Sequence, residues 1–138
     1  MKLIAKNTDY AVRAISHIAR NKGKIISVTN LVEELKMPGP FLRKILQVLN
    51  KKRILKSYKG QGGGFLLAMP ANKIFLVDLI VALQGPLILN SCIFKKTICP
   101  DKNICVLKKK IDDIERNVIA ELRSITVASL LKGESKRH

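Results

Sequence analysis

Two amphipathic segments joined by a punctuated turn restrict the folds open to this chain more than any other feature. Apolar side chains recur at helical spacing in residues 28–36 and again in residues 40–51. Between them, Met37-Pro38-Gly39-Pro40 ends one helix and starts the next, and Ser27 is placed to cap the first. The pattern predicts a helix-turn-helix. The residues expected to face inward on its second helix are Phe41, Ile45, Val48 and Leu49.

A glycine-rich hairpin is expected directly after these helices. Residues 54–58 and 65–68 have the composition of short strands and flank the sequence Lys59-Gly60-Gln61-Gly62-Gly63-Gly64. A helix-turn-helix followed by such a hairpin is a winged arrangement. The glycine run lacks the third glycine of a dinucleotide fingerprint, and no Gly-Lys-Ser/Thr follows it. We therefore do not expect it to bind a nucleotide.

Three further stretches have helical periodicity. The first, Tyr10–Arg20, would be capped by Thr8 or Asp9, and the second, Leu76–Gln84, ends at a Gly-Pro pair. The third, Val106–Arg123, is long and carries one apolar stripe, which predicts packing on a partner helix in a coiled-coil-like dimer contact. The stripe consists of Leu107, Ile111, Ile114, Val118 and Leu122.

The expected fold class is mainly α with a small β wing: a winged helix-turn-helix DNA-binding domain plus a long C-terminal dimerisation helix. We place the winged DNA-binding region in residues 1–85, a cysteine loop in residues 86–105, and the dimerisation helix and tail in residues 106–138. Thr126 is expected to cap a last short helix, Val127–Leu131.

The charge balance indicates a polyanionic partner. The chain has 26 basic and 10 acidic residues, a net charge of +16, and residues 1–83 contain 15 of the basic and 4 of the acidic ones. The second helix of a helix-turn-helix enters the major groove, so its polar face is expected to contact double-stranded DNA. The residues expected to do so are Arg43, Lys44 and Gln47 at base edges, Lys51 and Lys56 at phosphates, and Lys59 and Gly60 at the wing tip. The alternatives are a solvated basic helix face and a high isoelectric point that only aids solubility.

Three cysteines, Cys92, Cys99 and Cys105, occur close together and nowhere else. The chain shows no signal peptide and no membrane span, so we expect a cytoplasmic protein in which these cysteines are thiols or metal ligands rather than disulfides. Thiolates bind iron–sulfur clusters, zinc or copper, although the spacing is that of neither a zinc ribbon nor a bacterial ferredoxin. Three incidental thiols on a loop are the alternative.

A fourth ligand is not obvious from the cysteine segment itself. His17 is more typical of a surface or half-buried side chain than of a ligand. Asp9 could ligate from a partner subunit, or it could cap a helix. Neither a Cys–His pair with an orienting third group nor a pair of carboxylates is evident, so we do not expect an enzyme.

Together these stretches carry a resemblance to a known family. Over nearly its whole length the chain resembles the bacterial IscR/NsrR-type winged-helix transcription regulators, the Rrf-two family. The stretches that carry the resemblance, besides the three-cysteine segment, are Thr8-Asp9-Tyr10-Ala11-Val12-Arg13, Phe41-Leu42-Arg43-Lys44-Ile45-Leu46 and Ser57-Tyr58-Lys59-Gly60-Gln61-Gly62-Gly63-Gly64-Phe65-Leu66-Leu67-Ala68.

The resemblance implies a homodimer that binds palindromic promoter DNA. It also implies a 2Fe–2S or 4Fe–4S cluster on the three cysteines and one other ligand, sensing nitric oxide, redox state or iron–sulfur supply. The first interval between cysteines is one residue longer than usual, and Lys108 stands where the biogenesis regulators have a histidine ligand. Asp9 matches the aspartate that ligates from the other subunit in nitric-oxide sensors.

Two other functions stay open on the sequence. One is a cluster-free regulator of the same fold, similar to the cysteine-metabolism repressors, that acts through thiol oxidation or a protein partner. The other is a small electron carrier or a zinc-bound interaction module. Arg43 and Lys44 also differ from the acidic-then-amide pair of the biogenesis regulator, so the operator sequence does not follow from the resemblance.

Overall fold

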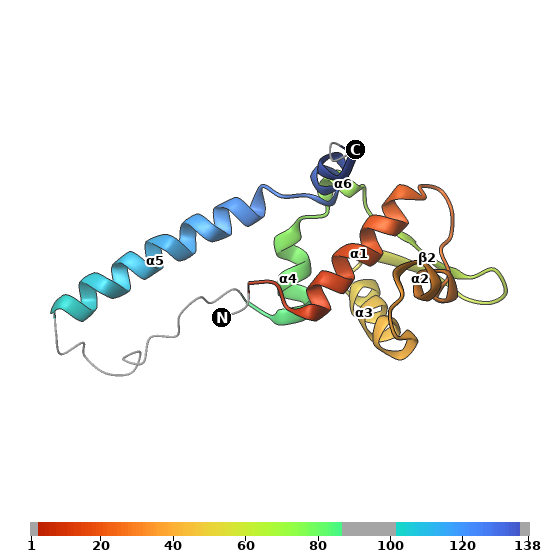
Figure 1. Ribbon diagram of the computed structural model, residues 1–138, viewed down its shortest axis with the longest axis horizontal. Helices are drawn as coiled ribbons and strands as arrows, with labels where there is room; N and C mark the ends of the chain where they lie inside the picture. Colours follow the sequence, from red (N-terminus) through yellow and green to blue (C-terminus); the bar gives the residue numbers. More distant parts are fainter. Residues whose placement is uncertain (1–2, 87–101, 136–138) are drawn as a thin grey trace.

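The chain folds into a helical body with one long helix extending from it, as the computed structural model shows in Figure 1. The structure describes residues 3–86 and 102–135. In order, its elements are α1 (Lys6–Arg20), α2 (Val28–Leu35), α3 (Gly39–Lys51), β1 (Leu55–Tyr58), β2 (Gly64–Leu67), the 3-10 turn η1 (Ala71–Lys73), α4 (Leu76–Gln84), α5 (Lys102–Arg123) and α6 (Val127–Ser135). Across these described ranges, every helix is too short or too polar to cross a lipid bilayer. The expected mainly α architecture with a small β wing is confirmed.

Helix α1 lies at the centre of the body and packs against α2, α3, α4, α6 and β2. Its buried face combines small and branched side chains, Ala11 and Ala14 with Ile15 and Ile18, all essentially inaccessible to solvent. The two alanines allow neighbouring helices to approach closely, while each buried isoleucine contributes roughly 1.5–3 kcal/mol of hydrophobic stabilisation. The core therefore forms around α1 rather than between α2 and α3 alone.

The two helices of the helix-turn-helix form as expected, with differences in detail. Ser27 caps α2 by accepting a hydrogen bond from the Asn30 N–H at 3.1 Å. Helix α2 ends at Lys36, which adopts the left-handed conformation with a φ of 54°. Gly39 of the turn sequence is already the first residue of α3. The inward residues of α3 are Leu42, Ile45, Leu46 and Leu49. Phe41 is half-buried and packs against the core as predicted, whereas Val48 is only half-buried and the prediction omitted Leu42 and Leu46.

The wing is a two-stranded antiparallel hairpin that is attached to the body by a third segment. In the hairpin, Leu55 pairs with Leu67 and Tyr58 with Gly64. Ile26, just before α2, exchanges two backbone hydrogen bonds with Phe65 of β2, at 3.0 and 2.9 Å. A lone two-stranded hairpin is only marginally stable in water, so this bridge fixes where the wing stands relative to α2 and α3.

The start of α1 differs from the sequence prediction. The helix begins at Lys6, its N-cap is Ala5, and neither Thr8 nor Asp9 caps it. Instead, Oε1 of Gln84, the last residue of α4, accepts hydrogen bonds from the Ala5 N–H at 2.9 Å and from the Thr8 hydroxyl at 2.6 Å. Local pattern could not reveal this cap, because its acceptor is 79 residues away in the chain.

The C-terminal helices also begin or end beyond their predicted limits. Helix α5 begins at Lys102, so Cys105 lies in its first turn and the predicted loop over residues 86–105 was wrong at its end. Thr126 caps α6 as expected, by accepting from the Ser129 N–H at 3.1 Å. Helix α6 continues to Ser135, past the predicted Leu131. Two backbone hydrogen bonds join the end of α5 to the start of α4. The Leu76 N–H donates to the Ile125 carbonyl, and the Val127 N–H donates to the Ile74 carbonyl.

Replacing Gln84 by leucine is expected to lower the free energy of unfolding by about 1–3 kcal/mol, because the buried Thr8 hydroxyl and the Ala5 N–H lose their acceptor. Chemical denaturation measures the change. Gln47→Leu is a matched control, since Gln47 is exposed and makes no side-chain hydrogen bond within the described residues; it should change stability by less than about 0.5 kcal/mol. Equal effects of the two variants would contradict the role of Gln84.

Candidate nucleic-acid interface and cysteine segment

One face of α3 presents an exposed row of basic and amide side chains. Arg43, Lys44, Gln47 and Lys51 are all exposed on the side of the helix opposite its buried leucines. Within residues 3–86 and 102–135, none of the three cations forms an ion pair. Their charges are therefore available to an external anion, and the structure brings these predicted contact residues together on one surface.

The wing carries a second set of exposed cations beside this row. Lys59 and Gly60 lie at its tip, and Gly60 has a φ of 93° that only glycine adopts readily. A tight turn closes the tip, in which the Gly63 N–H donates to the Gly60 carbonyl at 3.0 Å. Lys56 lies with its ammonium 5.6 Å from the ring centre of Tyr58, a cation–π contact that keeps the charge at the surface.

The last two glycines of the run are needed for a different reason, which is close backbone approach. A Cβ on Gly63 would collide with the carbonyl oxygen of Tyr58, and one on Gly64 would collide with the carbonyl of Ile26. Gly64 immediately precedes Phe65, so the collision would fall on the bridge that attaches the wing to the body. The predicted glycine-rich loop is thus also a packing element.

Between α3 and the wing lies a pocket with a volume of about 370 Å³. Its walls include Gln47 and Asn50 of α3, and Ser57, Tyr58, Lys59 and Phe65 of the wing. No acidic residue lines it. Asn50 and Ser57 were not predicted from the sequence as contact residues. The helical spacing of three that separates Asn50 from Gln47 could have indicated the first, but only the folded wing reveals the second.

The predicted cluster ligands are only partly visible in the structure. Cys92 and Cys99 lie outside the described residues, and Cys105 is described only as a position on α5. Asp9 is half-exposed on α1 and pairs with Arg13 at 3.2 Å. In the part of the chain that the structure describes, no three ligating side chains gather into a metal site. Asp9 is therefore accessible to a second subunit.

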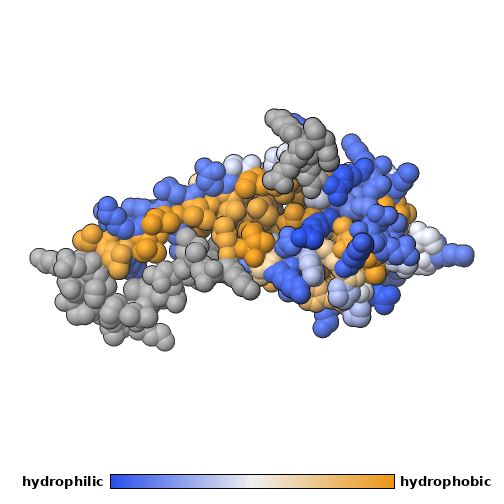
Figure 2. Space-filling model, in the orientation of Figure 1, coloured by the Kyte–Doolittle hydropathy of each residue, from blue (hydrophilic) through white to orange (hydrophobic). Residues whose placement is uncertain are grey.

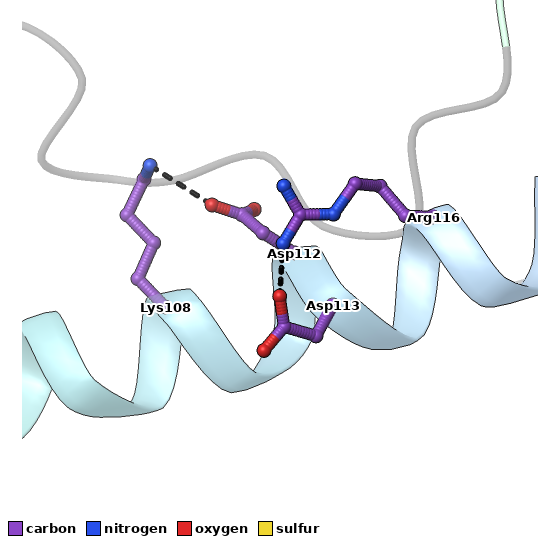
Figure 3. Close-up of polar contacts among 4 residues, drawn as sticks. All are labelled: Lys108, Asp112, Asp113 and Arg116. Atoms are coloured by element: carbon purple, nitrogen blue, oxygen red, sulfur yellow. Dashed lines mark hydrogen bonds and ion pairs between the residues drawn. The ribbon is translucent and has the colours of Figure 1, made fainter.

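The two other candidate ligand positions are engaged in polar contacts. His17 lies 3.2 Å from the Asn30 side chain, which ties α1 to α2. Lys108, at the position where the histidine ligand of the biogenesis regulators would stand, pairs with Asp112 at 3.3 Å, and Arg116 pairs with Asp113 nearby (Figure 3). Such exposed helical ion pairs contribute about 0.3–0.5 kcal/mol each, so they favour these side-chain positions only weakly.

Comparison with known proteins places the chain in a family. The sequence profile of the Rrf2 family, described as an iron-dependent transcriptional regulator, matches residues 4–133. The chain belongs to the Rrf2 family of transcriptional regulators. A protein of Aquifex aeolicus named as an HTH-type transcriptional regulator is 27% identical over 129 residues. The match covers 92% of this chain and 90% of the Aquifex protein. A similarly named protein of Haemophilus influenzae is 28% identical over 132 residues. That match covers 95% of this chain and 87% of the Haemophilus protein.

Solved structures with the same fold include two differently named regulators. CymR, the global cysteine regulator of B. subtilis, superimposes with a TM-score of 0.78 at 21% identity, covering 96% of this chain and 98% of its own. IscR of T. potens superimposes with a TM-score of 0.72 at 27% identity, and the match covers 100% of this chain and 91% of the IscR chain. The winged-helix fold of this Rrf2 protein is thereby confirmed. The family and these relatives are named as regulators rather than enzymes.

The long helix α5 of this Rrf2 protein leaves much of its apolar stripe uncovered. Leu107 is 62% exposed and Ile114 52%, and Val106 beside them is 57% exposed, whereas Leu122 is buried against the body. Figure 2 shows this apolar surface running along α5, and a largely hydrophilic surface over the winged end of the molecule. The two predicted functions, DNA contact and association, thus fall on different parts of the protein.

Replacing Gly64 by alanine is expected to destabilise the protein by about 2 kcal/mol or more and to loosen the wing, because the new Cβ would strike the Ile26 carbonyl. Thermal and chemical denaturation measure the loss. Gly133→Ala is the matched control: Gly133 lies in α6, a Cβ there meets nothing within 4 Å, and alanine favours the helix by up to about 1 kcal/mol. A Gly64→Ala variant as stable as Gly133→Ala would refute the packing role.

Proposed function

We propose that this Rrf2 protein is a homodimeric DNA-binding repressor whose hold on DNA is controlled by an iron–sulfur cluster. The observation that carries the DNA-binding part is the row of exposed cations on α3, unpaired within residues 3–86 and 102–135, next to a basic wing. A protein that neutralises DNA phosphates releases condensed counterions, which drives binding at moderate salt. Repression follows from occupancy, since a dimer bound over a promoter blocks access to it.

The exposed stripe of α5 supports the dimer. Three large apolar side chains, Val106, Leu107 and Ile114, are each more than half exposed on one helix. Contiguous apolar surface of this kind is unfavourable in water and is typical of protein–protein contacts. A second copy of α5 would cover it isologously, and two reader helices related by a two-fold axis would match a palindromic operator.

The proposed DNA contacts divide into base readers and phosphate contacts. Arg43→Ala is expected to weaken operator binding by about 1–3 kcal/mol and to relax specificity at one base pair. Lys51→Gln should weaken operator and random DNA alike and reduce the slope of log Kd against log salt by about 1 per subunit. Fluorescence anisotropy over a salt series measures both, with two chains expected per operator. Lys73→Gln, an exposed lysine on η1, which packs on α6, is the control. A salt-insensitive Kd would contradict the proposal.

The proposed sensor uses the three thiols, with Asp9 of the second subunit as the fourth ligand. Three thiolates are a donor set that fits an iron–sulfur cluster, and the half-exposed Asp9 carboxylate lies at the surface, where it pairs with Arg13. When bound, such a cluster supplies the reaction with nitric oxide or oxidants. Cys105 lies in the first turn of α5, so a change at its thiol would act directly on the start of the proposed dimer helix.

A cluster-free regulator of the same fold is the second candidate. It is favoured by the polar contacts of two candidate fourth ligands, since Asp9 pairs with Arg13 and His17 lies beside the Asn30 side chain. The thiols would then respond to oxidation directly or through a protein partner. One protein with this fold, CymR, is named as a global cysteine regulator, and another is IscR.

Anaerobic purification separates the two candidates. We expect iron and acid-labile sulfide to copurify with the wild-type chain and to fall by at least about tenfold in Cys92→Ala, Cys99→Ala or Cys105→Ala, because each removes one of three thiolates. Asp9→Ala should destabilise the cluster without abolishing folding, whereas Asp78→Ala, an exposed carboxylate on α4, is the control. Colourless protein that binds DNA only when its thiols are reduced would instead establish the cluster-free regulator.

A further inference from the structure

We infer that the pocket between α3 and the wing is a binding site for one sugar-phosphate unit of the DNA strand, with Asn50 and Ser57 as neutral phosphate-contact residues. This inference rests on the proposed DNA-binding function. It adds residues that the charge pattern does not reveal, and it predicts a contribution to affinity that does not depend on salt.

The position of the pocket selects this ligand. Helix α3 forms one wall and the wing the other. A winged-helix protein that places its reader helix in a major groove and its wing in the neighbouring minor groove must straddle the strand that separates the two grooves. The sugar-phosphate unit of that strand then lies between the two elements. The pocket volume of about 370 Å³ is at the lower end of the range for small-molecule sites, which suits one nucleotide backbone unit.

The hydrogen-bonding state of the lining residues supports the assignment. Asn50 and Ser57 are only partly exposed, yet neither side chain makes a hydrogen bond to any residue in the described ranges. Asn30 and Gln84, which have a similar exposure, are instead bonded to other residues of the protein. The polar atoms of Asn50 and Ser57 are therefore open to a ligand.

Sheet geometry explains why Ser57 faces α3. Ser57 pairs directly with Phe65, and Leu55 two residues earlier is buried against the body. Residues two apart on a strand share a face, and directly paired residues share it too. Ser57 and Phe65 therefore lie together on the side of the wing that faces α3. The hydroxyl can donate to a phosphate oxygen while the aromatic ring contacts the apolar side of a deoxyribose.

The pocket surface is mainly apolar, and the charge around it suits an anion. No acidic side chain lines it, and Lys59 stands at its rim without an ion pair in the described chain. The amide of Asn50 and the hydroxyl of Ser57 are uncharged donors, so they would bind a phosphate oxygen without displacing a counterion. Their loss should weaken binding to all DNA sequences equally.

The first test compares neutral and charged variants. Asn50→Ala and Ser57→Ala are each expected to weaken binding to operator and random DNA by roughly tenfold, with the salt slope unchanged. Lys59→Gln should instead reduce the slope by about 1 per subunit. Asn50→Asp keeps the side-chain shape and places a negative charge at the phosphate, so it should weaken binding further. Asn72→Ala, an exposed asparagine of η1, is the matched control.

The second test locates the phosphate. Operators carrying one methylphosphonate at a time are titrated with the wild-type protein and with Ser57→Ala, after denaturation curves have shown both to be folded. One neutralised phosphate, between the positions protected by α3 and by the wing, should weaken the wild type but have little effect on Ser57→Ala. If every position affects both proteins equally, or if Asn50→Asp binds as the wild type does, the inference fails while DNA binding stands. If the wild type binds no DNA, the proposed function fails as well.

Discussion

The two backbone hydrogen bonds between Ile26 and Phe65 determine how the functional surface is assembled. They link the hairpin to the segment before α2, as the bond from the Ile54 N–H to the Leu49 carbonyl links its base to α3, and they require close backbone contact at Gly64. Because the hairpin has only two strands, its own hydrogen bonds would not hold it at a defined angle. The position of the wing beside α3, and with it the pocket between them, depends on this bridge together with the buried Ile54 and Leu55 at the base of the hairpin.

Similar long-range polar contacts hold the other elements that matter for function. The Gln84 side chain, at the end of α4, accepts hydrogen bonds from the start of α1. The bridge between Phe75 and Thr126 fixes the point at which α5 leaves the body. Helix α4 thus carries one contact at each end, to α1 and to the α5–α6 junction. A change in the cysteine segment, which connects α4 to α5, would act on a helix that is tied to both the reader domain and the proposed dimer helix.

Much of the fold was predictable from local pattern. The limits of α4 and the caps at Ser27 and Thr126 agree with expectation, because helical periodicity, N-cap residues and Gly-Pro terminators are local signals. The errors have a common cause. The start of α1 was misplaced because Thr8 is buried and bonded to a residue remote in sequence. Leu42 and Leu46 were missed on α3 because the helix is covered on more than one side, by α1, α2 and α4. The structure also extends α5 back to Lys102, where no glycine or proline intervenes.

By itself the sequence determined that this chain is a basic winged helix-turn-helix of mainly α structure with a long amphipathic C-terminal helix, because charge, periodicity and turn residues are properties of the chain itself. It also supplied the cationic residues of α3 and the three cysteines. Only the tertiary structure decided that Asn50 and Ser57 line one pocket, that Lys108 pairs with Asp112, and that the stripe of α5 is uncovered. These depend on which faces meet across elements that are far apart in sequence, and local pattern carries no information about such contacts.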